Sequence, residues 1–199
     1  MSPEKAARRR EILEAAGAEF CEKGYAAATT LGLARRARIS KRDLYALFGS
    51  KQGVMEALIG AYTQTMTLTT LAPPRNAADF LATLETFGAA FLAQLLDEQR
   101  VLFYRLAIAE APQSEFARIL HERGIAPVKQ SVSAFLTQAV AAGIVRPQDA
   151  LLLADVFFGA LIGQTQIETL LGLTAPPDEE ARRARAKQAR AAVERLLTP

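Results

Sequence analysis

The sequence predicts an all-α protein. Half of its 199 residues are hydrophobic and 23% are charged, as in ordinary folded chains. Only 12 glycines and 9 prolines interrupt it, alanine is abundant, and β-branched residues seldom alternate with polar ones. Helix is therefore favoured along most of the chain, and about nine helices are expected.

The N-terminal stretch predicts a first helix over residues 3–23. Ile12, Ala16 and Phe20 recur every four residues, which places them on one buried face. Three arginines at 8–10 lie in the first turns, where the helix dipole disfavours cations. They are therefore either contacts for a nearby phosphate or a solvated basic end.

Two short helices joined by a tight turn follow. Residues 31–37 form the first, with Thr30 as the expected N-cap. Residues 41–48 form the second, and Ser40 and Asp43 have the spacing of a capping box with the serine as N-cap. This pattern predicts a helix-turn-helix, a DNA-binding motif.

The second short helix is expected to have two different faces. Its buried side carries Leu44, Leu47 and Phe48. Its outward side carries Lys41, Arg42, Tyr45 and Ala46. A basic, aromatic face opposite a complete buried face indicates contact with DNA rather than a merely solvated surface.

The charge distribution agrees with this interpretation. Residues 1–55 contain 11 basic and 6 acidic residues, a net charge of +5, whereas residues 56–199 contain 13 basic and 15 acidic residues, a net charge of −2. The N-terminal quarter is therefore the part expected to meet a polyanion.

A fourth helix is predicted over residues 51–71. Its first half is expected to bury Val54, Met55, Leu58 and Ile59. Its second half is polar, uncharged and rich in threonine, which is a mediocre helix former. This second half is either partly buried beside a cavity or a frayed helix end.

The remaining helices are delimited by proline, glycine or capping residues. They are expected over residues 77–96, 98–111, 114–123, 128–142 and 147–171, and a last one has Pro177 at its first position. The chain between 123 and 128 is expected to break at Gly124–Pro127. Gly159 and Gly163 permit close approach of another helix, either within one subunit or in a dimer. Dimerisation is favoured because one helix-turn-helix reads only one half-site, and two must lie about 34 to 36 Å apart.

One further pattern extends from residue 15 to residue 58. It consists of Ala15, Ala16, Phe20, Gly24, Tyr25, Thr29, Thr30, Leu33, Ala34, Ala37, Ile39, Ser40, Lys41, Leu44, Tyr45, Phe48, Ser50, Lys51 and Leu58. In this register the chain resembles the TetR family of transcriptional regulators. Residues 103–110 and 146–171 are similar, less specifically, to one of the family's ligand-binding subgroups.

The resemblance implies a three-helix helix-turn-helix domain over residues 1–53, joined by a shared helix to a ligand-binding and dimerisation domain over residues 54–199. It also implies a homodimer formed through the last two helices, a palindromic double-stranded operator, and a small-molecule effector that releases the DNA. The expected function is sequence-specific transcriptional repression in the cytoplasm, without enzymatic activity.

The positions of the family's DNA contacts are occupied by Thr30, Ser40, Lys41, Arg42, Tyr45 and Lys51. Arg42 is expected to read a base, because a guanidinium pairs bidentately with guanine, and Lys41, Tyr45, Thr30 and Lys51 to hold phosphates. Arg38 departs from the family's glycine; a left-handed conformation there would cost about 1 to 2 kcal/mol, which a further phosphate contact could offset. Asp43 also departs, and is interpreted mainly as a cap or alternatively as a partner for a cytosine amino group.

The expected effector contacts are Tyr62, Met66, Phe103 and Gln164, which combine reach with a polar tip or an adaptable shape. No charged residue accompanies them, so a mostly apolar effector is predicted. Two other functions remain as alternatives. One is an architectural DNA-binding protein without ligand control, and the other a helical enzyme acting on a small apolar substrate.

Several other sites are not expected. The lone Cys21 excludes an intramolecular disulfide and fits a reducing compartment. His121 is the only histidine, so neither a metal site nor a catalytic constellation is indicated, and no cofactor is expected. The longest uncharged run, 57–74, contains five threonines and two prolines and does not resemble a membrane span.

Overall fold

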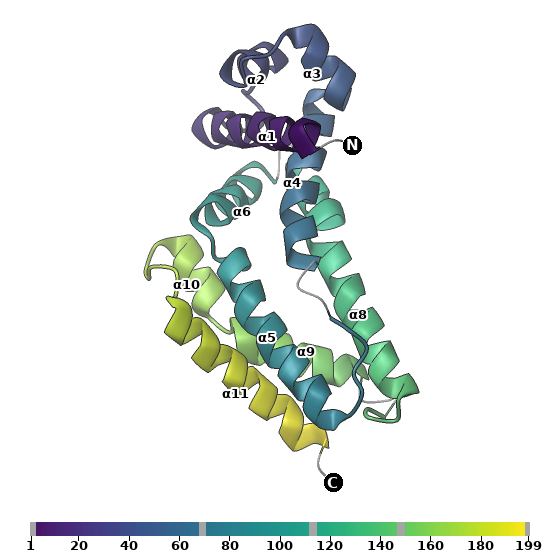
Figure 1. Cartoon of the computed structure of the whole chain (residues 1–199). Helices are drawn as coiled ribbons and strands as arrows, with labels where there is room; N and C mark the ends of the chain where they lie inside the picture. The colour runs from purple at the N-terminus through teal and green to yellow at the C-terminus, as the bar shows by residue number, and fades with distance from the viewer. Residues whose placement is uncertain (1–2, 68–70, 112–114, 147–149, 198–199) are drawn as a thin grey trace. The chain divides into compact units, whose positions relative to one another are not determined.

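The computed structural model describes residues 3–67, 71–111, 115–146 and 150–197 (Figure 1). Within these ranges the regular elements are all helices, which confirms the predicted all-α class. They are α1 (Pro3–Lys23), α2 (Thr30–Arg36), α3 (Lys41–Phe48), α4 (Lys51–Thr67), α5 (Ala77–Leu95), α6 (Glu98–Glu110), α7 (Phe116–Leu120), the π-helical η1 (His121–Ile125), α8 (Ala126–Ala141), α9 (Ala150–Ile162), α10 (Thr165–Leu171) and α11 (Glu179–Leu197). No helix taken singly is long and apolar enough to cross a bilayer in these ranges; only the bent pairs α5 with α6 and α9 with α10 reach that length and composition together.

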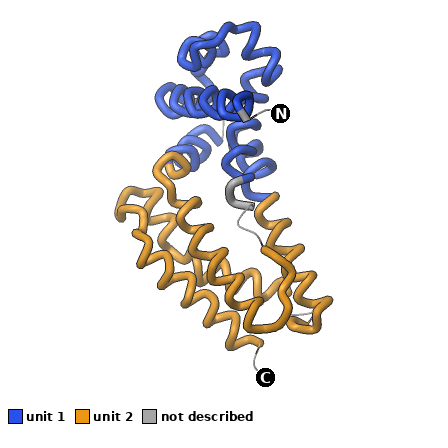
Figure 2. The backbone as a smooth tube through the Cα atoms, in the orientation of Figure 1, with its two compact units in different colours: residues 1–64, 102–126 blue, residues 65–101, 127–199 orange. Residues whose placement is uncertain are grey.

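The chain divides into two compact units, shown in different colours in Figure 2. Unit 1 comprises Met1–Gln64 and Leu102–Ala126, and unit 2 comprises Thr65–Val101 and Pro127–Pro199. The unit that contains the two short helices therefore also contains a segment from much later in the sequence. The predicted domain boundary after residue 53 remains a prediction.

The core of unit 1 is formed by the faces that the hydrophobic spacing predicts. Ile12, Ala16 and Phe20 of α1 are buried. The predicted face of α4, namely Val54, Met55, Leu58 and Ile59, is buried as well. Leu44 of α3 and Phe116 of α7 complete the same cluster. These helices are held together mainly by removal of apolar surface from water.

One predicted core residue is wrong. Leu47 is 47% exposed, although the sequence predicts it on the buried side of α3 with Leu44 and Phe48. In a helix, a residue three positions after Leu44 lies about 60° away from it around the axis, and Phe48 lies about 40° away on the other side. Because α3 is buried on a narrow side only, Leu47 falls outside the contact.

The core of unit 2 forms where α11 packs on α5 and α9 (Figure 1). Gly88 of α5 is the point of closest approach: a Cβ there would lie 3.1 Å from Leu161 Cδ1 and 3.2 Å from Phe157 Cζ, both on α9. Phe87 and Phe158 extend this contact, with ring centroids 6.5 Å apart. A Cβ at position 88 would require the Leu161 and Phe157 side chains to shift.

The predicted break near residues 124–127 is wrong, because α7, η1 and α8 follow one another without an interruption. Pro127 has no N–H to donate to the carbonyl of Arg123, the α-helical partner four residues earlier. The Thr63 hydroxyl of α4 lies 2.8 Å from that carbonyl and satisfies it. A π-turn thus accommodates the proline where a break was expected.

The helix predicted over residues 147–171 is divided into α9 and α10; residues 147–149 lie outside the described chain. Gly163 adopts a left-handed φ of 48° at the division, and Arg185 of α11 donates from Nε to the Leu161 carbonyl at 3.0 Å. The Arg185 guanidinium would contact a Cβ at position 163. An arginine therefore caps the end of α9 in the space that this glycine leaves.

The start of α11 differs by two residues from the prediction. Pro177 precedes the helix, and Asp178 caps it by accepting the Ala181 N–H at 2.8 Å. The Asp178 carboxylate satisfies one of the free N–H groups at the helix start. Proline has no side-chain acceptor and could not form this bond.

Candidate nucleic-acid interface

The start of α2 is fixed by Thr29, not by the predicted Thr30. Thr29 has an extended backbone, and its Oγ1 accepts the Gly32 N–H at 3.1 Å. Its carbonyl also accepts the first helical N–H, that of Leu33, at 2.9 Å. Thr30 is therefore the first residue of the helix, and its partly exposed hydroxyl is not used as this cap.

The end of α2 places Arg38 in the left-handed region, with φ of 54°. The Arg38 N–H donates to the Arg35 carbonyl at 3.1 Å, and the Ile39 N–H donates to the Ala34 carbonyl at 3.0 Å. These two bonds form a Schellman motif, whose left-handed position favours glycine. An exposed arginine occupies it here, at a cost of about 1 to 2 kcal/mol.

The start of α3 confirms Ser40 as the predicted N-cap, with the Asp43 side chain bonded to its hydroxyl. Ser40 Oγ accepts the Asp43 N–H at 3.0 Å, and the Ser40 hydroxyl lies 2.6 Å from Asp43 Oδ2. The two side chains therefore serve each other and the helix start. This supports the interpretation of Asp43 as a cap.

The outward face of α3 is the one predicted. Lys41, Arg42, Tyr45 and Ala46 are all exposed. Lys41 Nζ lies 5.7 Å from the centroid of the Tyr45 ring, within the range of a cation–π contact. The tyrosine is 44% exposed, so a lysine and an aromatic ring are presented side by side.

Lys51 at the start of α4 has an intramolecular role. Its Nζ donates to the carbonyls of Tyr25 and Ala26, at 2.8 and 3.1 Å, and lies 4.7 Å from the Tyr25 ring centroid. An ammonium has three protons, so one remains for a further acceptor. Two of the three Lys51 protons therefore hold the loop before α2.

Gly53, which the sequence interpretation did not single out, allows α4 to follow α3 at once. A Cβ at position 53 would collide with the Phe48 carbonyl oxygen. The Gly53 N–H donates to Ser50 Oγ at 2.9 Å, which caps α4. A glycine three residues after a serine, between two helices, is the signal that could have revealed this contact.

A buried charge joins α1 to α2, and it too was not foreseen. The side chain of Glu19 is 5% exposed; Lys23 Nζ lies 2.8 Å from one of its oxygens and Arg36 Nη1 3.2 Å from the other. The Lys23 ammonium, and after it Arg36, hold the pKa of the Glu19 carboxyl below its ordinary value, against the opposing effect of burial. Gly32 leaves room for this carboxylate, which would lie 2.5 Å from a Cβ at that position.

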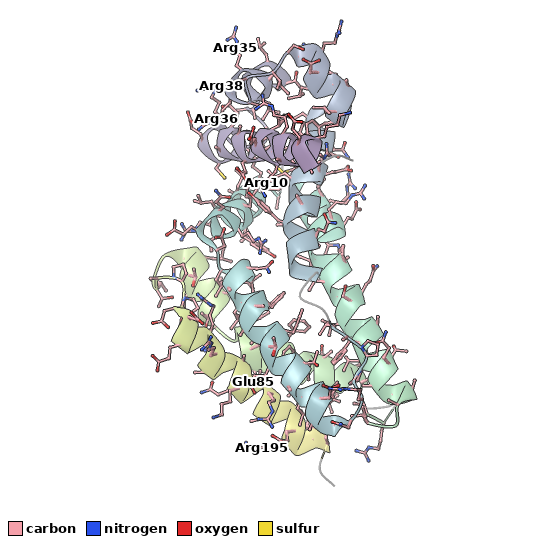
Figure 3. All side chains as sticks on the ribbon, viewed as in Figure 1. Arg10, Arg35, Arg36, Arg38, Glu85 and Arg195 are labelled. Atoms are coloured by element: carbon pink, nitrogen blue, oxygen red, sulfur yellow. The ribbon has the colours of Figure 1, made fainter. Side chains whose placement is uncertain are left out.

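The arginines of α1 differ in their surroundings. Arg9 lies over the Phe48 ring of α3, with Cζ 4.5 Å from the centroid. Arg8 and Arg10 form exposed pairs with Glu11 and Glu14. Figure 3 labels Arg10 together with Arg35, Arg36 and Arg38 of the α2 region. Arg9 therefore packs on α3, whereas for Arg8 and Arg10 both a phosphate contact and a solvated basic end stay predictions.

Two of the expected effector contacts lie together in unit 1. The rings of Tyr62 and Phe103 meet edge to face, with centroids 5.9 Å apart. Phe103 is 4% exposed and also contacts the Phe116 ring. Gln164 is exposed at the start of α10 in unit 2, and the side chain of Met66 lies outside the described part of the structure.

Two family models match the chain. One, for bacterial regulatory proteins of the tetR family, matches residues 12–58, and the other, for the AefR-like transcriptional repressor C-terminal domain, matches residues 82–197. The chain belongs to the TetR family. It is a DNA-binding transcriptional regulator with a C-terminal domain of the ligand-binding type, and its family consists of regulators rather than enzymes.

Solved structures of TetR-family regulators resemble the whole chain. A TetR regulator from Agrobacterium tumefaciens is 29% identical, with a TM-score of 0.79 over 98% of this chain and 95% of that one. The flavonoid-responsive regulator FrrA is 25% identical, with a TM-score of 0.74 over 96% and 97%. A putative TetR-family regulator from Mesorhizobium loti, 21% identical with a TM-score of 0.75 over 98% of both chains, shares the fold. No curated protein matched the sequence.

Proposed function

We propose that this TetR-family protein is a homodimeric repressor that binds a palindromic operator through α3 and is released by a small, mostly apolar effector. The observation that carries the proposal is the outward face of α3. Lys41, Arg42 and Tyr45 are exposed there, while the caps of α2 and α3 hold the helix by local bonds. A rigid helix with an unobstructed basic face is what reading of the major groove requires.

The proposed contacts divide into base and phosphate contacts. Arg42 reads a guanine, because its guanidinium can form two parallel bonds to the base edge. Lys41, Tyr45, Thr30 and Arg38 hold phosphates, and Lys51 does so with its third proton. Ser40 contributes through its place at the helix start, since its hydroxyl is engaged with Asp43.

The proposed dimer is formed by the last helices, and unit 2 offers apolar surface for it. Leu151 and Leu152 of α9 and Ile167 and Leu171 of α10 are exposed, Leu151 to 79%. No atom of the described chain lies within 4 Å of a Cβ built on Gly159. A helix of a second copy could approach closely there. Two reading helices about 34 to 36 Å apart would then match a palindrome.

The proposed effector is aromatic or aliphatic. Tyr62, Phe103, Met66 and Gln164 remain the proposed contacts, within a regulatory domain over residues 54–199 that follows a DNA-binding domain over residues 1–53. The flavonoid response of FrrA, at 25% identity, supports an apolar ring system as the first class to test. The expected compartment is the cytoplasm.

The test is selection of DNA by the purified wild-type chain from a random-sequence library, followed by affinity measurements over a range of salt concentrations. An enriched inverted repeat and a steep salt dependence are expected, because phosphate contacts release counterions. Arg42→Ala should weaken binding by about 10- to 100-fold and relax the preference at one base pair of each half-site. The matched control is Arg118→Ala, which removes an exposed arginine of α7.

Two results would overturn the proposal. Absence of an enriched sequence, with binding of all duplexes alike, would favour an architectural DNA-binding protein. Equal losses for Arg42→Ala and Arg118→Ala would show that only net charge matters. For the effector, a flavonoid and a long-chain acyl compound added to the operator complex should differ in their ability to release it.

A further inference from the structure

The loop at residues 24–26 joins α1 to the helix-turn-helix. Gly24 has a left-handed φ of 82°, and its N–H donates to the Phe20 carbonyl at 2.9 Å, which ends α1. Its carbonyl accepts the Ala28 N–H at 3.1 Å. Thr29, which follows Ala28 directly, is the N-cap of α2. The position of this loop therefore sets where α2 begins.

A carboxylate from a distant helix holds this loop. Both oxygens of Glu110 lie 3.2 Å from the Ala26 nitrogen, and accept its N–H across a separation of 84 residues. A Cβ at Gly24 would lie only 2.8 Å from Glu110 Oε1, so a glycine is needed for the carboxylate to approach. An N–H that donates to a carboxylate forms a charge-assisted bond, which is stronger than a neutral one.

Glu110 is poorly placed for the stability of its own helix. It is the last residue of α6, and the C-terminal end of a helix disfavours negative charge. The helix dipole therefore does not explain an acid at this position. The bond to Ala26 does, because it requires a long side chain with an acceptor at its tip.

A cation holds the same loop from another element. Lys51 of α4 donates to the carbonyls of Tyr25 and Ala26, so the Ala26 residue is bound at its N–H by an anion and at its carbonyl by a cation. The Tyr25 ring is buried against Phe20 of α1 and Phe116 of α7, with centroids 5.6 and 5.7 Å apart. Burial raises the pKa of the Tyr25 hydroxyl, and the carboxylates of Glu115 and Glu110 raise it further.

We propose that Glu110 is a positioning residue for DNA reading, a role that rests on the proposed function. Its carboxylate fixes the loop at 24–26 and therefore the start of α2, which carries the turn and α3. The segment at 102–126 is then part of the DNA-reading unit, although the family resemblance places it in the domain over residues 54–199. Glu110 touches no DNA in this proposal.

The test compares three variants of the full-length chain on the operator selected by the wild type and on a scrambled duplex of equal length. Glu110→Ala removes the acceptor. Glu110→Gln keeps an acceptor oxygen at the same reach and loses only the charge. Glu122→Gln is the charge control, because Glu122 is an exposed residue of the same segment whose carboxylate pairs with Arg118.

If Glu110 positions the loop, its variants should lose affinity for the operator and not for the scrambled duplex. Glu110→Ala should weaken operator binding by about tenfold, and Glu110→Gln should restore it to within about threefold of the wild type. Binding to the scrambled duplex should not weaken in either variant, because removal of a negative charge does not oppose association with a polyanion. Hydrogen exchange at the Ala26 amide should be fastest in Glu110→Ala and intermediate in Glu110→Gln. Glu122→Gln should change none of these quantities.

Three results would overturn the proposal. One is operator binding by Glu110→Ala at wild-type affinity. The second is an equal loss on both duplexes, which would indicate general unfolding. The third is unchanged exchange of the Ala26 amide in Glu110→Gln, a conservative variant expected to fold. Failure of the wild type to select any operator would refute the proposed function itself and, with it, this role; the amide exchange would still report the bond between Glu110 and Ala26.

Discussion

Both units combine an apolar core with side chains that bind backbone groups, such as Arg185 in unit 2, but in unit 1 these polar contacts gather around α2 and α3. In unit 1, polar side chains fix individual backbone groups: Thr29 and Ser40 cap helices, and Lys51 binds loop carbonyls. In unit 2, α5 packs on α9 through phenylalanine rings, and Gly88 of α5 leaves room for the side chains of α9. Hydrogen bonds are directional and set a position, whereas apolar burial is non-directional and supplies stability. In unit 1 the directional bonds fix the starts of α2 and α3, the helices that the proposed function places at the DNA.

The largest effect is expected from breaking the apolar contact of unit 2. Phe157 of α9 is fully buried, with its ring centroid 6.3 Å from that of Phe87 on α5, so Phe157→Ala should lower the free energy of unfolding by about 3 to 5 kcal/mol. Chemical denaturation measures this loss. Phe158→Ala, at a partly exposed neighbour on the same helix, is the control and should cost less; an equal cost would mean that burial does not distinguish the two rings.

The next effect concerns the buried carboxylate of unit 1. Glu19→Gln should cost about 1 to 3 kcal/mol, because it weakens the bonds to Lys23 and Arg36. The folded-state pKa of Glu19 lies below its ordinary value of 4.5, so its contribution is present above that pH and is lost as the pH falls through the folded-state pKa. Unfolding measured from pH 7 down to pH 2 should show a weaker acid dependence for the variant. An unchanged acid dependence would contradict the ion pair.

A smaller effect, with opposite signs in two measurements, is expected at Arg38. Arg38→Gly removes the left-handed strain, so stability should rise by about 1 kcal/mol. The same change removes a proposed phosphate contact, so affinity for the operator should fall. Thermal unfolding and DNA titration of one preparation test both. A simultaneous rise in stability and affinity would exclude a DNA contact by Arg38.

The smallest effect is expected at Lys41. Lys41→Ala should leave stability nearly unchanged, because the residue is exposed and contacts mainly the Tyr45 ring. Binding should weaken to a similar extent on operator and scrambled DNA, and the salt dependence should decrease by about one phosphate contact. A change in sequence preference would instead assign Lys41 to a base.

Sequence reasoning failed where a local signal was ambiguous or absent. Thr29 and Thr30 are adjacent and equally able to cap, so only the backbone conformation of Thr29 decides between them. A proline within a run of helix formers indicates a break, but Thr63 supplies the missing bond and the helix continues as a π-turn. Arg38 was the favourable case, since its departure from the family's glycine predicted the left-handed strain that the structure contains.

The sequence by itself determined the helical class, the bounds of α1 and α3 and the outward face of α3, because spacing and capping act over only a few residues. Only the tertiary structure decided three contacts: Glu110 binds the loop before α2, Lys51 binds carbonyls of the same loop, and Glu19 is buried between two cations. Apart from the pair of Glu19 with Lys23, which lies one helical turn away, these contacts join residues far apart in the sequence. No local pattern specifies them, because their geometry exists only after the helices have packed.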